Sequence, residues 1–166
     1  MSSKLRKNLK NSLRRFKNPI KIFNSLNVLL IIVKKALRVY GWEFVAITDR
    51  GLLNRIAKIL PNAVPCKTAP AAIVIVANPK SGRLEGYYPQ ECGAAAQNIL
   101  LQAVDMRLGA CWCGIWPVEE RISVVRALLN MAKEKIPFCV IAVGMADEIP
   151  RLRKNHEPLE VTRFAP

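Results

Sequence analysis

Two runs of apolar residues, each as long as a β-strand, constrain the fold of this chain more than any other feature. Residues 71–78 read AAIVIVAN, and residues 138–144 read FCVIAVG. A strand that is apolar throughout, rather than at alternate positions, is typical of a strand buried on both faces. Helices must then cover both sides of the sheet, which predicts a layered domain.

The segments around these runs alternate between the patterns of strands and helices. The sequence predicts strands at 42–49 and 110–115 and helices over about 50–60, about 90–106 and from Pro117 through Leu129. Three adjacent alanines at 94–96 indicate that the middle helix is central and tightly packed. This order predicts an α+β or α/β layered fold, with residues 1–166 forming one domain without internal repeats.

Three side-chain positions support these helix starts. Asp49 is placed to cap the helix that follows it, and Pro117 suits the first turn of the last helix. Glu119 and Glu120 stand where carboxylates complement the positive end of the helix dipole.

The positive charge of the chain is concentrated in its first quarter. The net charge is +14, and residues 1–42 contain 11 Lys or Arg residues and no acidic residue. Such a segment is typical of a transit peptide, of an arm that binds nucleic acid or a membrane surface, or of a phosphate-binding helix start. The apolar run Val28 to Val33 is far shorter than the ~20 residues of a membrane-spanning helix. We expect neither a membrane anchor nor a secretory signal, and therefore a cytoplasmic protein with reduced cysteines.

The cysteines do not match a disulfide framework or a zinc ribbon, because their number is odd and no CxxC motif is present. Cys111 and Cys113 would point to the same face of a strand, and small buried hydrophobic residues are their expected role. A metal or redox pair is the alternative. The single histidine, His156, lies in a polar tail, so we expect no catalytic Ser/His or Cys/His pair and no metal site. The five cysteines are Cys66, Cys92, Cys111, Cys113 and Cys139.

Several stretches, in this order, resemble the nitroreductase family of flavoproteins. They read NSLRRF (11–16), GWEFVAITDR (41–50), AAIVIVAN (71–78), AAAQNILLQA (94–103), LGACWCGIWPVEER (108–121) and PFCVIAVGMADEIPRLR (137–153). The resemblance implies an α+β fold, a three-layer α/β/α sandwich that forms an intertwined homodimer with FMN at the interface. It also implies hydride transfer from NADH or NADPH through FMN to a nitroaromatic, quinone or related acceptor, with the flavin performing the chemistry.

The resemblance assigns the FMN phosphate to two groups of basic residues. The Arg-x-Ser-x-Arg pattern of the family corresponds here to Lys10, Ser12 and Arg14, where lysine keeps the charge but loses the bidentate fork of arginine. Arg151 and Arg153 stand where the family has a second basic pair after the last strand. A solvated basic surface is the alternative role for these cations.

The resemblance assigns the flavin ring to the segment Cys113, Gly114, Ile115 and Trp116. In the family this backbone lies against the flavin and offers an amide to its reactive nitrogen. A glycine suits a place where backbone must approach a ligand closely, and a simple turn before Pro117 is the alternative.

The chain departs from the family pattern in residues 1–41, a divergent basic segment. Residues 36–41 read ALRVYG where the family has a pattern resembling Ala-Pro-Ser-x-x-Asn-x-Gln-Pro, whose Ser and Asn contact the flavin. Arg107 also replaces a small residue. Two alternatives to an active oxidoreductase follow: a relative with impaired or no flavin binding, and a protein whose basic arm binds nucleic acid or a membrane surface. The leading hypothesis, a flavin-dependent oxidoreductase, predicts binding to neither nucleic acid nor a membrane.

Overall fold

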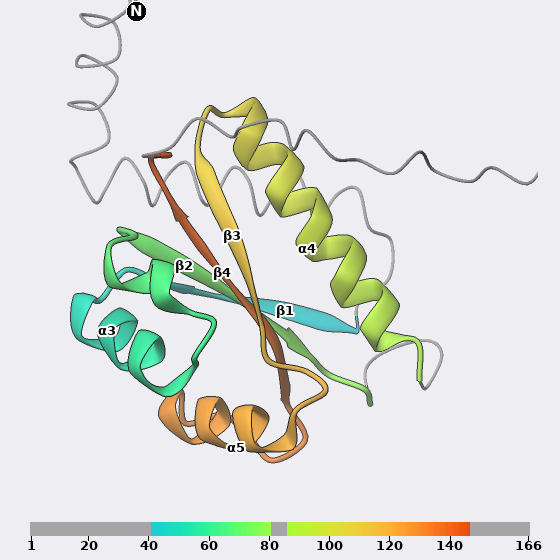
Figure 1. Ribbon diagram of the computed structural model, residues 1–166. Coiled ribbons are helices and arrows are strands. Elements are labelled where there is room, and N and C mark those ends of the chain that lie inside the picture. Colours follow the sequence, from blue (N-terminus) through green and yellow to red (C-terminus); the bar gives the residue numbers. More distant parts are fainter. Residues whose placement is uncertain (1–40, 81–85, 147–166) are drawn as a thin grey trace, which may run out of the picture.

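The computed structural model describes residues 41–80 and 86–146, and these form a four-stranded sheet with helices on both faces (Figure 1). The strands follow the order β1-β2-β4-β3 across the sheet, and each neighbouring pair is antiparallel. In chain order the elements are β1 (Trp42–Ile47), α3 (Arg50–Ile59), the 3₁₀ helix η1 (Val64–Lys67), β2 (Ala71–Ala77), α4 (Tyr88–Asp105), β3 (Gly109–Gly114), α5 (Glu119–Leu128) and β4 (Ile136–Gly144).

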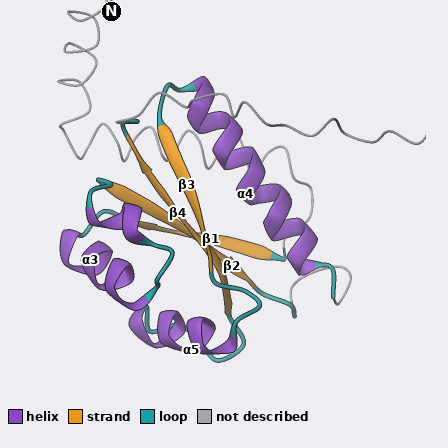
Figure 2. Ribbon diagram, in the orientation of Figure 1, coloured by secondary structure: helices purple, strands orange, loops and turns teal. Residues whose placement is uncertain are grey.

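The two apolar runs form the central strands, as the sequence predicts. Every residue of β2 is buried, and so are the seven residues from Pro137 to Val143 in β4. Successive residues of β2 enter opposite layers: Ile73 and Ile75 pack with α4, whereas Val74 and Val76 pack with α3 and α5. The same division is visible in Figure 2, where α4 lies on one side of the sheet and the other two helices on the opposite side. The predicted three-layer α/β/α sandwich of the α+β class is therefore confirmed.

The long helix α4 packs closely on the sheet because its buried face carries small side chains. Cys92, Ala95, Ala96 and Ala103 are all buried, together with the larger Ile99. Small residues let the helix backbone approach the strands, as the run of alanines indicates. The predicted central helix is confirmed, with its start two residues earlier than the sequence suggests.

The helix ends show which local signals determine the boundaries. The Asp49 carboxylate accepts a hydrogen bond from the Leu52 backbone N–H at 2.7 Å, so Asp49 caps α3 as predicted. Glu119 and Glu120 form the first turn of α5, also as predicted. Pro117 lies outside that helix, contrary to the prediction, because Val118 is the N-cap residue. Pro117 instead belongs to a turn closed by a hydrogen bond from Val118 N–H to Ile115 O, 3.1 Å.

Arg107 occupies the position where the helix α4 reverses into β3. Its φ of 58° lies in the left-handed region, and Leu108 N–H donates to Ala103 O at 2.8 Å. Arg107 N–H donates to Val104 O at 2.9 Å, which completes a Schellman motif. A glycine is most common at this position because it has no Cβ, so arginine is an unfavourable choice here.

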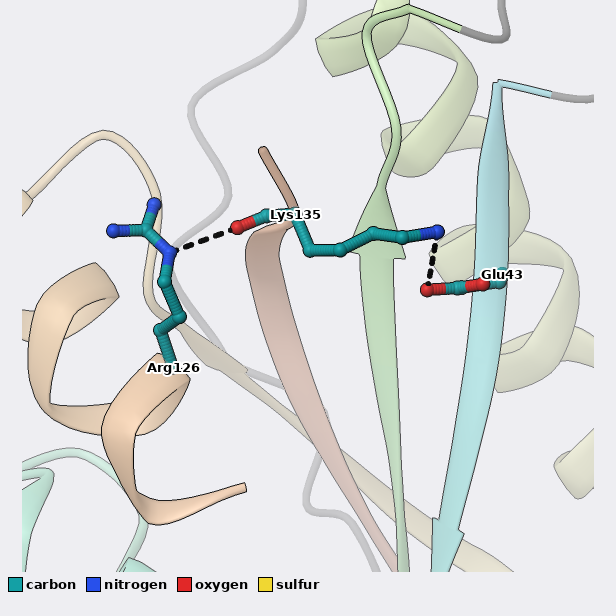
Figure 3. Close-up of polar contacts among 3 residues, drawn as sticks. All are labelled: Glu43, Arg126 and Lys135. Atoms are coloured by element: carbon teal, nitrogen blue, oxygen red, sulfur yellow. Dashed lines mark hydrogen bonds and ion pairs between the residues drawn. The ribbon is translucent and has the colours of Figure 1, made fainter. Parts of the chain in front are cut away.

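A chain of polar contacts joins α5 to the far edge of the sheet (Figure 3). Arg126 Nε donates to the Lys135 carbonyl at 2.9 Å, and Lys135 Nζ lies 2.9 Å from Glu43 Oε1 on β1. The Lys135 side chain therefore crosses the end of β2, the strand that lies between β4 and β1 (Figure 3). Because half of the Glu43 side chain is exposed, the ion pair contributes at most about 1 kcal/mol.

Within the described ranges, no helix is long and apolar enough to cross a membrane. The same ranges contain no group of three or more His, Cys, Asp or Glu residues that could hold a metal ion.

Candidate functional site

The part of the predicted cofactor site that the structure describes lies where β3 ends. Cys113 and Gly114 are its last two residues, and Ile115 and Trp116 lead into the turn before α5. β3 is an outer strand of the four-stranded sheet, with β4 as its neighbour. The predicted phosphate ligands, Lys10, Ser12, Arg14, Arg151 and Arg153, lie outside the described residues.

Hydrogen bonds in this segment determine which amide faces the edge of the sheet. The N–H groups of Ile115 and Trp116 both donate to the Phe138 carbonyl, at 3.1 and 3.0 Å. Bonded and non-bonded residue pairs alternate in an antiparallel ladder, so Gly114 directs its N–H and C=O away from β4. Of the four residues assigned to the ring, Gly114 is the one whose amide can meet a ligand at this edge.

Two side chains donate hydrogen bonds to the carbonyl of Gly114, which points away from β4. Asn62 Nδ2 donates to Gly114 O at 3.0 Å, and Arg121 Nη1 donates to it at 3.3 Å. Asn62 precedes η1 and Arg121 lies in α5, so two separate elements fix this peptide group. The sequence does not reveal these two residues as neighbours of Gly114. Asn62 is far from Gly114 along the chain, and Arg121 lies on another element, α5.

Among the described residues, the space around Gly114 is open. A Cβ added there would meet no atom closer than Asn62 Nδ2, at 3.9 Å, and its φ lies outside the left-handed region. At Gly144 and Gly109, in contrast, an added Cβ would come within 2.8 Å of Pro70 Cδ and 3.1 Å of the Ala146 backbone. Neither packing nor backbone conformation therefore requires glycine at position 114. A flat group lying against the backbone would require it, and this fits a flavin.

Aromatic side chains adjoin this edge on the α4 side of the sheet. The rings of Trp116 and Phe138 are stacked with centroids 5.7 Å apart, and the Tyr88 ring meets Trp116 edge-on at 6.5 Å. The ring of Trp112 also lies beside that of Phe138, with centroids 6.1 Å apart. Trp112 and Trp116 remain 39% and 37% exposed, so the cluster presents an apolar surface that a planar ligand can cover.

The opposite side of β3 carries the CxC pair. Cys113 is buried in the layer formed by α3, η1 and α5, and Cys111 is exposed. The prediction that both are buried hydrophobic residues is therefore wrong for Cys111. Cys111 and Trp112, in the middle of this outer strand, are both exposed, whereas Gly109 and Ala110 are half-buried.

The family model described as "Nitroreductase family" matches residues 66–145, which include the whole segment from β2 to β4. A crystal structure from Bacteroides thetaiotaomicron, titled "Putative NADH dehydrogenase/NAD(P)H nitroreductase", is 31% identical to the chain with a TM-score of 0.76. The similarity covers 84% of this chain and 83% of that one. The chain belongs to the nitroreductase family.

Two further relatives are similar to this chain. The crystal structure titled "Putative NADH Oxidase" from Clostridium acetobutylicum is 31% identical to this chain, with a TM-score of 0.69. The similarity covers 83% of this chain and 89% of that one. A curated protein from Methanothermobacter thermautotrophicus, named "Putative NADH dehydrogenase/NAD(P)H nitroreductase", is 35% identical over 117 residues, or 70% of this chain. The match spans 61% of the length of that relative.

Proposed function

We propose that the chain is an FMN-dependent oxidoreductase, which accepts hydride from NADH or NADPH and passes it to a nitroaromatic, quinone or similar acceptor. The observation that carries this proposal is Gly114, whose amide faces an open sheet edge beside exposed aromatic rings. Membership of the nitroreductase family supports the flavin, and the names of three relatives support a nicotinamide reductant.

Each described residue of the site has a role that its contacts support. Gly114 lets a planar ring approach the backbone and offers it a hydrogen-bond donor, while Asn62 and Arg121 keep that peptide in place. Trp116, held by Phe138, shields the site from water on the α4 side. Bound FMN would supply the redox chemistry, so the protein needs no nucleophile or general base of its own.

The phosphate of FMN would be held by residues that the resemblance assigns and the described ranges do not include. These are Lys10, Ser12 and Arg14 at the start of the chain, with Arg151 and Arg153 after the last strand. Arginine pairs bind phosphate through two parallel hydrogen bonds, whereas Lys10 supplies charge alone.

The visible absorption spectrum of the purified full-length protein tests this function. We expect a flavin spectrum, either as purified or after addition of FMN and removal of the excess, and bleaching by NADH or NADPH without oxygen. A protein that stays colourless after FMN treatment and consumes neither nicotinamide would overturn the proposal. Binding to nucleic acid with a steep salt dependence would then favour the basic-arm alternative.

The substitution Gly114→Ala tests the site itself. An added methyl group has space among the described residues, so the free energy of unfolding should stay nearly unchanged. It would stand between the backbone and the ring, and FMN affinity should fall about tenfold or more, equivalent to about 1.4 kcal/mol. Gly93→Ala is the matched control, because its Cβ would also meet nothing closer than 4.0 Å. Equal FMN affinity in both variants would contradict the assignment of Gly114.

A further inference from the structure

A groove lies between α3 and α5, on the side of the sheet opposite α4 (Figure 2). It has a volume of about 620 Å³ and is lined by three residues from each helix. On each helix these residues are spaced i, i+3 and i+4, so they share one face. The lining residues are Arg55, Lys58 and Ile59 of α3, with Val124, Ala127 and Leu128 of α5.

The apolar residues of this groove are distinct from those that α3 and α5 bury against the sheet. Leu53 of α3 and Val125 of α5 are fully buried in the core. Ile59 and Val124, in contrast, remain 37% and 42% exposed. An apolar surface shared by two helices, rather than a single exposed side chain, is typical of a binding groove.

The charge of the groove is positive and is confined to the α3 wall. Arg55 and Lys58 are both exposed, and neither forms an ion pair or a side-chain hydrogen bond within the described ranges. No acidic residue lines the groove, and the two acidic residues of α5, Glu119 and Glu120, lie in its first turn. Lys58 complements the dipole of α3 in its last turn, but this does not account for Arg55 in the middle of the helix.

These features favour a helix of another protein as the occupant. An amphipathic helix can place its apolar stripe in a groove between two helices, with anchor residues spaced i, i+3, i+4 and i+7. Ile59, Val124 and Leu128 would contact these anchors. Because both cations lie on the α3 wall, the acidic residues of the partner would lie along one flank of its stripe, which also sets its direction in the groove.

Charge disfavours two other occupants, the basic first quarter of this chain and a second copy. Residues 1–42 contain 11 Lys or Arg residues and no acidic residue, and the whole chain has a net charge of +14. Both would bring further positive charge to Arg55 and Lys58, which costs binding energy.

We propose that the groove between α3 and α5 is a docking site for an acidic amphipathic helix of a partner protein. The apolar anchors of that helix cover Ile59, Val124 and Leu128, and its acidic flank pairs with Arg55 and Lys58. Because the groove lies on the face opposite α4, the partner leaves the aromatic surface on the α4 side uncovered (Figure 2). This inference does not depend on flavin binding.

A synthetic peptide and the full-length protein test the proposal. The probe is a fluorescein-labelled helix of about 18 residues, with leucines spaced i, i+3, i+4 and i+7 and glutamates along one flank of this stripe. Fluorescence anisotropy at about 0.15 M salt measures its affinity, because such salt screens long-range attraction to the basic chain. We expect a micromolar Kd, and about tenfold weaker binding when glutamine replaces the glutamates.

Charge-reversal variants test the cationic wall. Arg55→Glu should weaken the binding of the probe about tenfold, because it replaces an attraction to the acidic flank with a repulsion. Lys133→Glu makes the same change of net charge at an exposed position outside the groove, and should leave the affinity within about twofold. Equal weakening by the two variants would show attraction to the net charge alone and would overturn the proposal.

Val124→Gln tests the apolar lining without a change of charge. It should weaken the binding of the probe about fivefold, whereas Val64→Gln, at an apolar residue that is 55% exposed outside the groove, should have no effect. No binding of the probe to the original protein, or unchanged affinity in Val124→Gln, would overturn the proposal. A change of oligomeric state in Val124→Gln without the peptide would also overturn it, because the occupant would then be a second copy.

Discussion

At the scale of single residues, Arg107 is the clearest place where side chain and backbone conformation disagree. Its φ of 58° would suit a glycine, and a left-handed conformation costs other residues about 1–2 kcal/mol. Glycine is also more flexible in the unfolded chain, which offsets part of the gain. We expect Arg107→Gly to increase the free energy of unfolding by about 0.5–1 kcal/mol, measured by urea denaturation.

Asn130 provides the matched control for this substitution. It closes α5 in the same way, with a φ of 49° and a hydrogen bond from Met131 N–H to Arg126 O of 3.0 Å. Asparagine tolerates the left-handed region better than arginine, so Asn130→Gly should stabilise the protein less than Arg107→Gly. A gain from Asn130→Gly as large as that from Arg107→Gly would contradict this explanation.

At the scale of secondary-structure elements, Asp49 tests how much one cap contributes. Its carboxylate satisfies the Leu52 N–H at 2.7 Å at the start of α3. Asp49→Ala should lower the free energy of unfolding by about 1 kcal/mol in urea denaturation. Asp105→Ala is a suitable comparison, because Asp105 is the last residue of α4 and its carboxylate accepts a hydrogen bond from Gln102 Nε2 at 3.2 Å rather than from a helix N-terminus. An equal loss in both variants would show that the cap has no specific effect.

The elements could be predicted from the sequence because their signals are local. An apolar run such as 71–78, or an aspartate before a helix, acts through neighbouring residues and survives in almost any tertiary context. The sequence places Pro117 in the wrong element, because its position depends on the hydrogen bond from Val118 N–H to Ile115 O, which closes a turn before the helix. Turn geometry of this kind is not apparent from residue types alone.

The site could be predicted only in part, for the same physical reason. The family resemblance assigns Gly114 to the flavin site, but the side chains that hold Gly114 and its aromatic neighbours come from separate elements. Tyr88, Trp116 and Phe138 lie in α4, the turn after β3, and β4, so their contacts depend on the assembled sheet. The exposure of large apolar side chains such as Trp112 and Trp116 indicates the site, but only the structure gives this exposure.

At the scale of the whole molecule, the exposed apolar side chains of α4 bear on the homodimer that the family resemblance predicts. Leu101 and Val104 are 60% and 72% exposed, on the helix that also contributes Tyr88 to the aromatic cluster. A second copy covering this helix would remove apolar surface from water, at about 25 cal/mol per Å². The family resemblance predicts that both copies contribute to the flavin site. In such a dimer the second copy would also cover the open edge at Gly114.

This reasoning predicts that flavin binding and dimer formation are coupled. Val104→Glu and Leu101→Glu would each place a charge where the second copy packs, so both should shift the protein toward the monomer in sedimentation experiments. Because a ligand that binds only the dimer stabilises it, FMN should reverse part of this shift, and the variants should bind FMN more weakly. Val124→Glu, at a position of α5 that is 42% exposed on the opposite face of the sheet, controls for the added charge alone. A monomeric variant that retains FMN with unchanged affinity would mean that one chain builds the site by itself.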